Sequence, residues 1–555
     1  MAESLNLRPP EMMMKLARLG AFHQCRLSFM RQLTRRMAAE QWQFTRPRFD
    51  INSKGEGVAV YTAKTPNGCY SLVAFAHDLP ADQRSDRVIA TAWDATFTLF
   101  DGVPDDADIA RLFKNVPKQE AGRISHTELS LSRANRSVRL WDYVLNKLAA
   151  GQQPSQCEID KVGYLMRTTA VYGSGKFGSA DRQMIQDRRE LRAPFQVEML
   201  SVFLTRAFVK DLIEHLAVEK GGDQAVRLDD DLAKRISIGN STGLGMAPFL
   251  VNHPALLHQW IQAREQAIAH VRAIKTLQET EKTYFLNIFK RAQLSALNWQ
   301  TDHELQAGKI KILHEDIKKI EQKLNANCLD QQNAWDSLIA WSQDHLSLEG
   351  QEWLASLILE PYPEITDRLQ HEMHSDHSDF AIDGSMTNQE LMDIIQRRFG
   401  WALAEDWDNH AHISRIWYVS QEKLEPRLGE RFEEKLDPYE QPLGIGFQAF
   451  NAHQALLQRR GDEIIADFID EYPQFRRIIR RIQLYADMAY SEIQDNVLGA
   501  DLMPIDMLRA KLSFFGATRF DPRSDRWVRI AMFNGAPYPD QLNLENADDW
   551  VYAAP

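Results

Sequence analysis

The amino-acid sequence predicts an α+β protein that is predominantly helical, with a small antiparallel sheet near the N-terminus and a long helical hairpin in the middle. Three observations lead to this prediction. Residues 57–100 hold closely spaced runs rich in Val, Tyr, Phe, Ile and Thr, which favour strands. Residues 254–325 contain hardly any Gly or Pro and repeat apolar residues at helical spacing. Most of the chain after residue 102 shows the same spacing, so helices should outnumber strands.

The length and composition are those of a globular protein with several packed units. The chain has 555 residues, of which 44% are hydrophobic and 26% are charged, and a single hydrophobic core does not keep growing to this size. We expect three units: residues 1–150 with an N-terminal helix and the sheet, residues 151–330 with two glycine loops and the helical hairpin, and residues 331–555 as an acidic helical unit.

The sequence predicts neither export nor membrane insertion. No run approaches the ~20 consecutive apolar residues that span a bilayer. The N-terminal residues lack the order of basic, apolar and small residues that marks a secretory signal. The four cysteines are too scattered for a disulfide framework or a zinc site. We therefore expect a soluble, cytoplasmic protein.

The N-terminal unit is expected to combine one helix with a three-stranded meander. Residues 11–40 repeat apolar residues at helical spacing and carry Lys15 and five arginines on the other face. We interpret that basic face as one in contact with solvent rather than with a membrane. The runs 57–65, 69–77 and 87–100 should pair antiparallel, because the first connection is too short for a crossover. The helix should cover their apolar face.

The remaining segments with helical spacing are predicted to be helices, and a short strand pair near 520–533 is expected to close the fold. The stretch 254–325 should break near 298–308 into an antiparallel pair, a shape that often forms oligomer contacts, so we expect a homo-oligomer. The other predicted helices are 105–115, 126–149, 156–169, 194–219, 331–358, 387–404, 411–424, 443–495 and 504–513.

Charge is divided unevenly along the chain. Residues 1–250 hold 34 Lys and Arg against 29 Asp and Glu, a net charge of +5, whereas residues 251–555 hold 31 against 48, a net charge of −17. The acidic second part argues against extended nucleic-acid contact, which needs a clustered basic surface. Arginine supplies 23 of the first 34 basic residues. Its planar fork grips carboxylate or phosphate in a ligand or in the protein itself, and the sequence leaves both alternatives open.

The first candidate binding loop is the glycine-rich segment 173–178. It matches the G-x-G-x-x-G pattern, in which backbone N–H groups approach a phosphate. A dinucleotide-binding fold does not fit, because helix-forming residues 194–216 stand where its second strand belongs. A P-loop does not fit either, because Phe177 replaces the Ser or Thr that holds magnesium. We expect the loop to bind an anion in another way, through Gly173, Ser174, Gly175 and Lys176 with the nearby Arg167 and Arg182.

The second candidate loop spans residues 236–248 and is rich in glycine and small polar residues. It contains G-x-S-x-G with Ser241 at the centre, a pattern that exposes a nucleophilic serine in α/β-hydrolases. The sequence argues against that fold, because a long helical stretch follows instead of alternating strands and helices. Ser241 and His253 are nevertheless the nearest candidates for chemistry, and a structural turn is the alternative. The residues expected to bind a carboxylate here are Asn240, Thr242 and Gly243.

Arginines complete the predicted site. Arg133 and Arg136 stand three residues apart and would share one face of the predicted helix 126–149. A cleft with two glycine loops and convergent arginines suits a small anionic metabolite. The sequence therefore predicts an enzyme that acts on a carboxylate- or phosphate-bearing metabolite, without distinguishing transfer, hydrolysis and elimination or indicating a cofactor. The alternative is a non-catalytic helical scaffold or regulatory protein that assembles through residues 254–325.

Histidines gather in an acidic segment around residue 374. Histidines three apart can share a helix face and bind a divalent ion, but the H-E-x-x-H pattern is absent. We interpret the segment as an exposed loop and assign no metal site to it. The sequence does not decide whether a metal contacts the histidines of this region, which are His371, His374, His377, His410 and His412.

Overall fold

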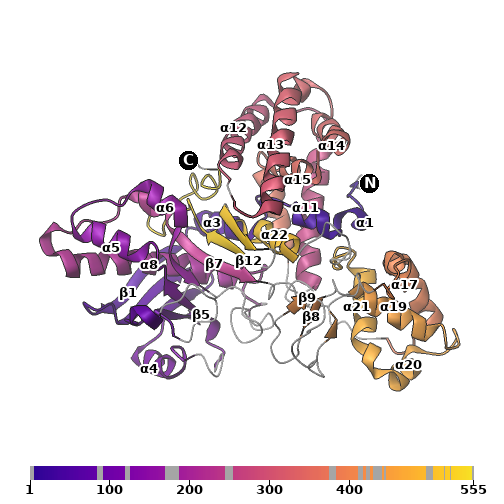
Figure 1. Cartoon of the computed structure of the whole chain (residues 1–555), viewed down its shortest axis with the longest axis horizontal. Coiled ribbons are helices and arrows are strands. Elements are labelled where there is room, and N and C mark those ends of the chain that lie inside the picture. The colour runs from indigo at the N-terminus through magenta and orange to yellow at the C-terminus, as the bar shows by residue number, and fades with distance from the viewer. Residues whose placement is uncertain are drawn as a thin grey trace.

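The computed structural model has a mixed α+β architecture in which helices predominate, as the sequence predicts (Figure 1). The sheet and the helices that cover it occupy one end of the long axis of the molecule. Helices α17 (Asn388–Leu403) and α21 (Arg476–Asp487) lie at the other end. The structure describes residues 5–83, 92–118, 125–168, 185, 187–243, 254–299, 301–373, 383–409, 417–419, 426–428, 441–442, 445–494, 504–517, 519–524 and 527–552.

A nine-stranded sheet organises the fold. Its strand order is β1-β2-β3-β4-β5-β6-β7-β12-β11, and neighbours run antiparallel except for the parallel pair β6 and β7. The prediction of a small antiparallel sheet is therefore wrong, because the sheet is large and mixed. The predicted meander supplies β2, β3 and β4, and the predicted strand pair supplies β11 and β12. The strands are β1 (Gln43–Ile51), β2 (Gly57–Lys64), β3 (Cys69–Ala76), β4 (Ala95–Asp101), β5 (Glu128–Arg136), β6 (Tyr164–Thr168), β7 (Ser237–Gly243), β11 (Arg519–Ser524) and β12 (Trp527–Met532).

Strands β5 and β6 occupy segments that the sequence predicts as helices. In β5, leucines alternate with serines, a period of two that belongs to strands. The helix predicted over 126–149 is right only for α5 (Trp141–Ala149). In the next predicted helix, α6 (Gln156–Val162) ends at Gly163, which adopts a left-handed conformation with φ of 79°, and the chain then enters β6.

Helix α8 (Gln196–Gly221) covers one face of the sheet. Its residues from 196 to 209 are all buried, and it contacts β2, β3, β4, β5 and β7. On the opposite face, α4 (Asp106–Asn115) packs Leu112 into a cluster with Val73 and Phe75. The prediction of one helix over 11–40 is wrong. That segment forms α1 (Pro10–Met13), α2 (Leu16–Gly20) and α3 (Phe29–Ala39), of which α3 packs against α8.

Residues 254–325 form three helices, because the chain breaks at 273–278 as well as at 298–303. Helices α12 (Glu279–Leu297) and α13 (Glu304–Asn325) are in contact, and a ring nitrogen of His314 lies 2.9 Å from the carbonyl oxygen of Ala296. Assembly through this region stays a prediction, as does the division into three units. None of the helices in the described part of the chain is long and apolar enough to cross a membrane. The later helices are α11 (Pro254–Arg272), α12 (Glu279–Leu297), α13 (Glu304–Asn325), α14 (Ala334–His345), α15 (Leu348–Leu357), α16 (Pro363–Glu372), α19 (Ile445–Leu456), α20 (Ile465–Glu471) and α22 (Pro504–Phe515).

A second, three-stranded sheet replaces part of a predicted helix. Its order is β10-β8-β9, and all its pairings are antiparallel. Strand β8 (Trp417–Val419) falls inside the helix predicted over 411–424, so that prediction is wrong at these residues. The other two strands are β9 (Pro426–Leu428) and β10 (Gln441–Pro442).

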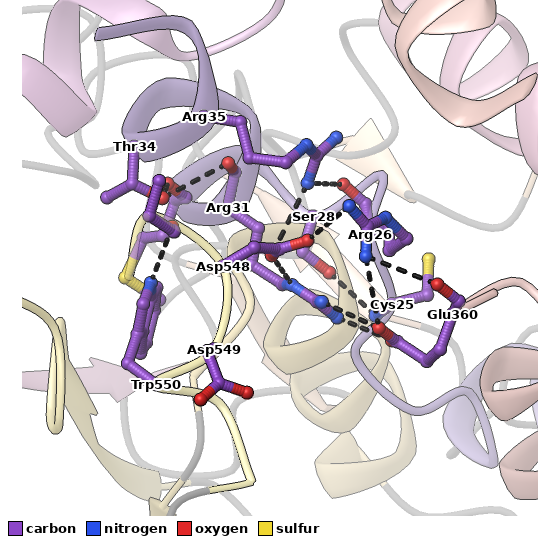
Figure 2. A network of polar contacts seen from close by, with 12 residues as sticks. Cys25, Arg26, Ser28, Arg31, Thr34, Arg35, Glu360, Asp548, Asp549 and Trp550 are labelled. Carbon is purple, nitrogen blue, oxygen red and sulfur yellow. Dashed lines mark hydrogen bonds and ion pairs between the residues drawn. The ribbon is translucent and has the colours of Figure 1, made fainter. Parts of the chain in front are cut away.

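The arginines of α3 are buried, so the predicted solvent-facing basic surface is wrong. Arg31 is 1% exposed, and it donates to Glu360 through two N–H groups (2.6 and 2.8 Å) and to Asp548 through Nε (2.5 Å). Arg26 and Arg35 lie 2.8 and 3.5 Å from the same aspartate, and Figure 2 shows the three guanidinium groups around its carboxylate. The two acidic partners of Arg31 are 329 and 517 residues away in the chain. We call this group the Asp548 cluster.

A second buried group of charges, the Glu352 cluster, joins the N-terminal segment to α11 and α15. Arg8 binds Glu265 through two N–H groups (2.7 and 2.8 Å) and Glu352 through a third (2.8 Å). Arg18 and Arg264 lie 2.6 and 2.9 Å from Glu352. The Glu352 side chain is fully buried. In these two clusters, internal ion pairing accounts for five of the 23 arginines of the first 250 residues.

Gly57 begins β2 in a conformation that other residues rarely adopt. Its φ is 143°, and an added Cβ would lie 1.9 Å from the carbonyl oxygen of Asp50. We expect Gly57→Ala to lower the free energy of unfolding by about 2–3 kcal/mol, measured by chemical denaturation. Gly308→Ala is the matched control, because Gly308 lies within α13 with nothing near its added Cβ. The control should be neutral or more stable by up to about 1 kcal/mol, and equal effects of both changes would contradict the prediction.

Candidate functional site

The adjacent parallel strands β6 and β7 have their carboxyl ends at the same edge of the sheet, where β6 ends beside Ala134 of the antiparallel strand β5. Thr168 at the end of β6 pairs with Ala134 of β5 and with Asn240 of β7. Parallel strands have their carboxyl ends at the same edge, and ligands often bind outside such ends. The first predicted glycine segment follows β6, and the second overlaps β7. This edge gathers the predicted site residues that the structure describes.

Arg133 and Arg167 lie on one face of this edge. Arg167 is in register with Asn135 of β5 and with Gly239 of β7. Arg133 precedes Asn135 by two residues, so strand alternation places both arginines on the same face. Arg167 is buried, and the half-buried Arg133 stacks its guanidinium 4.0 Å from the ring centroid of Trp93. Burial lowers the pKa of Arg133, but a guanidinium stays charged at neutral pH. The face therefore carries two neighbouring positive charges.

Arg136 lies on the opposite face and forms internal ion pairs. A strand places residues three apart on opposite faces, so the prediction that Arg133 and Arg136 share a helix face is wrong. The Arg136 guanidinium lies 3.7 Å from Asp94 and 3.6 Å from Asp78, and it stacks over Trp141 at 4.8 Å. The buried Asp94 also accepts a hydrogen bond from the backbone N–H of Arg136 (2.9 Å). Arg136 thus fixes the end of β5.

The second glycine segment is extended as far as Gly243. Asn240 is buried, and its Nδ2 donates to the carbonyl oxygen of Thr168 (2.7 Å), which joins β7 to β6. Ser241 and Thr242 follow within β7, in register with β12. A nucleophilic serine of the hydrolase kind needs a sharp strand-to-helix turn. The extended backbone at Ser241 does not provide that turn.

The remaining predicted site residues are divided between described and undescribed parts of the chain. His371 lies near the end of α16 and is exposed. Within the described ranges, no three His, Cys, Asp or Glu side chains come together as a metal site requires. The predicted residues that lie outside those ranges are Gly173, Ser174, Gly175, Lys176, Arg182, His253, His374, His377, His410 and His412.

Sequence reasoning missed Trp93 and Asp94, which directly precede β4. Trp93 supports the Arg133 guanidinium, and Asp94 pairs with Arg136. The backbone N–H of Asp94 also donates to Oδ1 of Asn135 (2.9 Å). The signal in the sequence is a Trp-Asp dipeptide before a strand-like run. It becomes informative only when β4 and β5 are known to pair.

Comparisons with known proteins do not assign the chain to a family. No protein-family model, curated protein or solved structure matches it. A fold alone does not imply a function, so the functional evidence is the arrangement of residues beside the carboxyl ends of β6 and β7.

Proposed function

We propose that the protein is a cytoplasmic enzyme that binds a small carboxylate- or phosphate-bearing metabolite at the carboxyl ends of β6 and β7, beside β5. The observation that carries the proposal is the position of Arg133 and Arg167 on one face of the edge where two parallel strands end. Arginine forks bind carboxylate and phosphate through paired N–H groups. Stacking on Trp93 orients the plane of the Arg133 guanidinium and so fixes the direction of its donors.

In this proposal the two arginines hold the anionic group of the substrate. Backbone N–H groups of the glycine segments that follow β6 and overlap β7 add further donors, as in other anion sites. Ser241 and His253 are the nearest candidates for the chemical step. The reaction itself would be identified from the metabolite that the protein binds.

We expect Arg133→Gln and Arg167→Gln each to weaken anion binding by about ten- to a hundredfold, because each change removes charge-assisted hydrogen bonds worth about 1.5–3 kcal/mol. Native mass spectrometry of the purified protein would first identify any bound metabolite. Calorimetry with that metabolite, or with inorganic phosphate, pyrophosphate and citrate as probes, would then measure the affinity.

Arg139→Gln is the matched control for these variants, because Arg139 is an exposed arginine just beyond the end of β5. It should bind the same anions as tightly as the unchanged protein. The proposal fails if no anion binds, or if the Arg133 and Arg167 variants bind as tightly as the Arg139 variant.

A second candidate function is non-catalytic assembly of copies of this chain, which apolar exposure on α12 and α13 favours. Leu294 and Leu297 are each 49% exposed, and Ile312 is 45% exposed. Leu294→Asp combined with Leu297→Asp should lower the mass of the assembly measured by light scattering. An unchanged mass at all concentrations would remove this candidate.

A further inference from the structure

A groove of about 600 Å³ runs along α8 and shares no lining residue with the arginine edge described above. Its volume falls within the range of about 300–1,000 Å³ that is typical of small-molecule sites. Residues of α8 from Leu204 to Val218 line it at intervals of three and four, so they form one face of that helix. Strand β1 forms one wall, and the segment 538–540 forms the other.

Each wall of the groove is anchored in the fold. β1 is the edge strand of the sheet, and its register shifts between Thr45 and Arg48. On the other side, Tyr538 is buried beneath the Arg206 guanidinium, which lies 4.0 Å from its ring centroid. Arg206 in turn donates to the carbonyl oxygen of Ala536 (2.8 Å). These contacts of Arg206 fix the position of the wall that contains Tyr538.

The groove is lined by three basic and three acidic side chains, and four of these six form two ion pairs. Arg227 and Asp540 are the other two. Asp211 Oδ2 accepts hydrogen bonds from Arg46 (2.6 Å) and from the hydroxyl of Tyr61 (2.7 Å). One turn further along α8, Glu214 Oε1 lies 3.0 Å from Lys210 Nζ. A ligand with a single net charge would leave a surplus of charge in this half-buried space, whereas a ligand with both charges would not.

The pairs retain hydrogen-bonding capacity on both the acidic and the basic side. Asp211 Oδ1 and Glu214 Oε2 accept no hydrogen bond from the residues that the structure describes. Asp211 and Glu214 are three residues apart on one face of α8, so an ammonium group could bind both. Lys210 uses one of three N–H groups for Glu214, and Arg46 uses one N–H group for Asp211. The remaining donors suit a carboxylate.

We propose that this groove binds a zwitterionic α-amino acid with a large apolar or aromatic side chain. The ammonium group binds the free carboxylate oxygens of Asp211 and Glu214, and the carboxylate binds Arg46 and Lys210. The side chain lies among the aromatic residues of the groove, which include Phe44 and Phe49 of β1. Their rings offer apolar surface and edges for stacking.

Calorimetry with L-phenylalanine and L-leucine tests this proposal directly. At least one of them should bind, and phenethylamine and 3-phenylpropanoate should bind at least tenfold more weakly than L-phenylalanine. The first analogue lacks the carboxylate and the second lacks the ammonium, so each loses one set of charge-assisted hydrogen bonds. The proposal is overturned if neither amino acid binds at millimolar concentration, or if either analogue binds as tightly as L-phenylalanine.

Glu214→Gln should weaken amino-acid binding about tenfold, because it removes the negative charge that binds the ammonium group of the ligand. The Gln side chain still offers an oxygen that can accept the hydrogen bond from the backbone N–H of Leu228. Glu219→Gln is the control on the exposed end of the same helix, and its affinity should not change. Arg46→Gln tests the contact with the ligand carboxylate. Arg46 is half-exposed, so this change should affect the stability of the fold less. Arg133→Gln should leave amino-acid binding unchanged, so this site and the proposed anion site are tested separately.

Discussion

Glu352→Gln is expected to lower the free energy of unfolding by about 3–5 kcal/mol, because it would leave buried arginines without their common partner. Glu352 and Arg264 are both fully buried, and they lie 2.9 Å apart. Arg8 and Arg18 bind the same carboxylate at 2.8 and 2.6 Å. Glu265 can compensate only part of this positive charge, since it already binds Arg8 and Arg264.

Chemical denaturation of Glu352→Gln, compared with that of the control Glu315→Gln, would measure this effect. Glu315 is an exposed residue of α13, so its change should move the midpoint little, within about 0.5 kcal/mol. If Glu352→Gln were as mild as the control, the cluster would contribute nothing to the stability of the fold.

The same cluster predicts how stability depends on pH. Burial disfavours the ionised carboxylate of Glu352, but the charges of Arg8, Arg264 and Arg18 outweigh this and hold its pKa well below the ordinary value of 4.5. Because the folded-state pKa is depressed, the stabilisation is fully present above about pH 4.5 and is lost as the pH falls toward the folded value. A series of denaturation curves in acid should show this loss in the unchanged protein and a smaller loss in Glu352→Gln.

Asp548→Asn is expected to lower the free energy of unfolding by about 3–4 kcal/mol, since Arg31, Arg26 and Arg35 would lose a shared counter-charge. Burial opposes the ionisation of Asp548, yet these three arginines hold the pKa of its carboxyl well below the ordinary range. Glu360 and Asp367 remain as partners, so the loss should be slightly smaller than for Glu352. The segment 533–552 should also become easier to cleave with a protease.

Asp549→Asn is the control for this prediction, because the neighbouring aspartate is 62% exposed and binds only Arg291 among the described residues. An exposed ion pair contributes about 0–1 kcal/mol. Equal losses in both variants would mean that the Asp548 cluster is not a special source of stability. If Asp548→Asn lowered the stability but did not change the rate of proteolysis, the Asp548 cluster would stabilise α3 and not the segment 533–552.

Local patterns in the sequence predict the local parts of this fold. The meander from β2 to β4, helix α17 and helix α22 follow from runs whose period shows within ten or fifteen residues. The strand β6 has only five residues and follows directly on α6 and Gly163. So short a run shows no clear period of its own, and the sequence predicts it as part of the helix 156–169. The size of the sheet could not be predicted, because β7 and β12 become neighbours only in the folded chain.

The partners of buried charges are equally hard to predict. The alternation of apolar and basic residues around Arg31 looks like that of a surface helix, since a charged residue is rarely buried unless it is paired. Its partners, Glu360 and Asp548, stand in distant acidic segments with no pattern that marks them. For the candidate site, the sequence identified Arg133 and Arg167. Their common face depends on the register of β5, β6 and β7, which no short motif encodes.

The position of β12 beside β7 has a consequence during synthesis on the ribosome. Nearly 300 residues separate the two strands, and at about 5–20 residues each second their translation takes roughly 15–60 s. Throughout that interval β7 has emerged with one edge unpaired, and such an edge is a template for pairing with other chains. The nascent protein should therefore depend on chaperones that bind exposed strands, above all when many ribosomes translate one message close together.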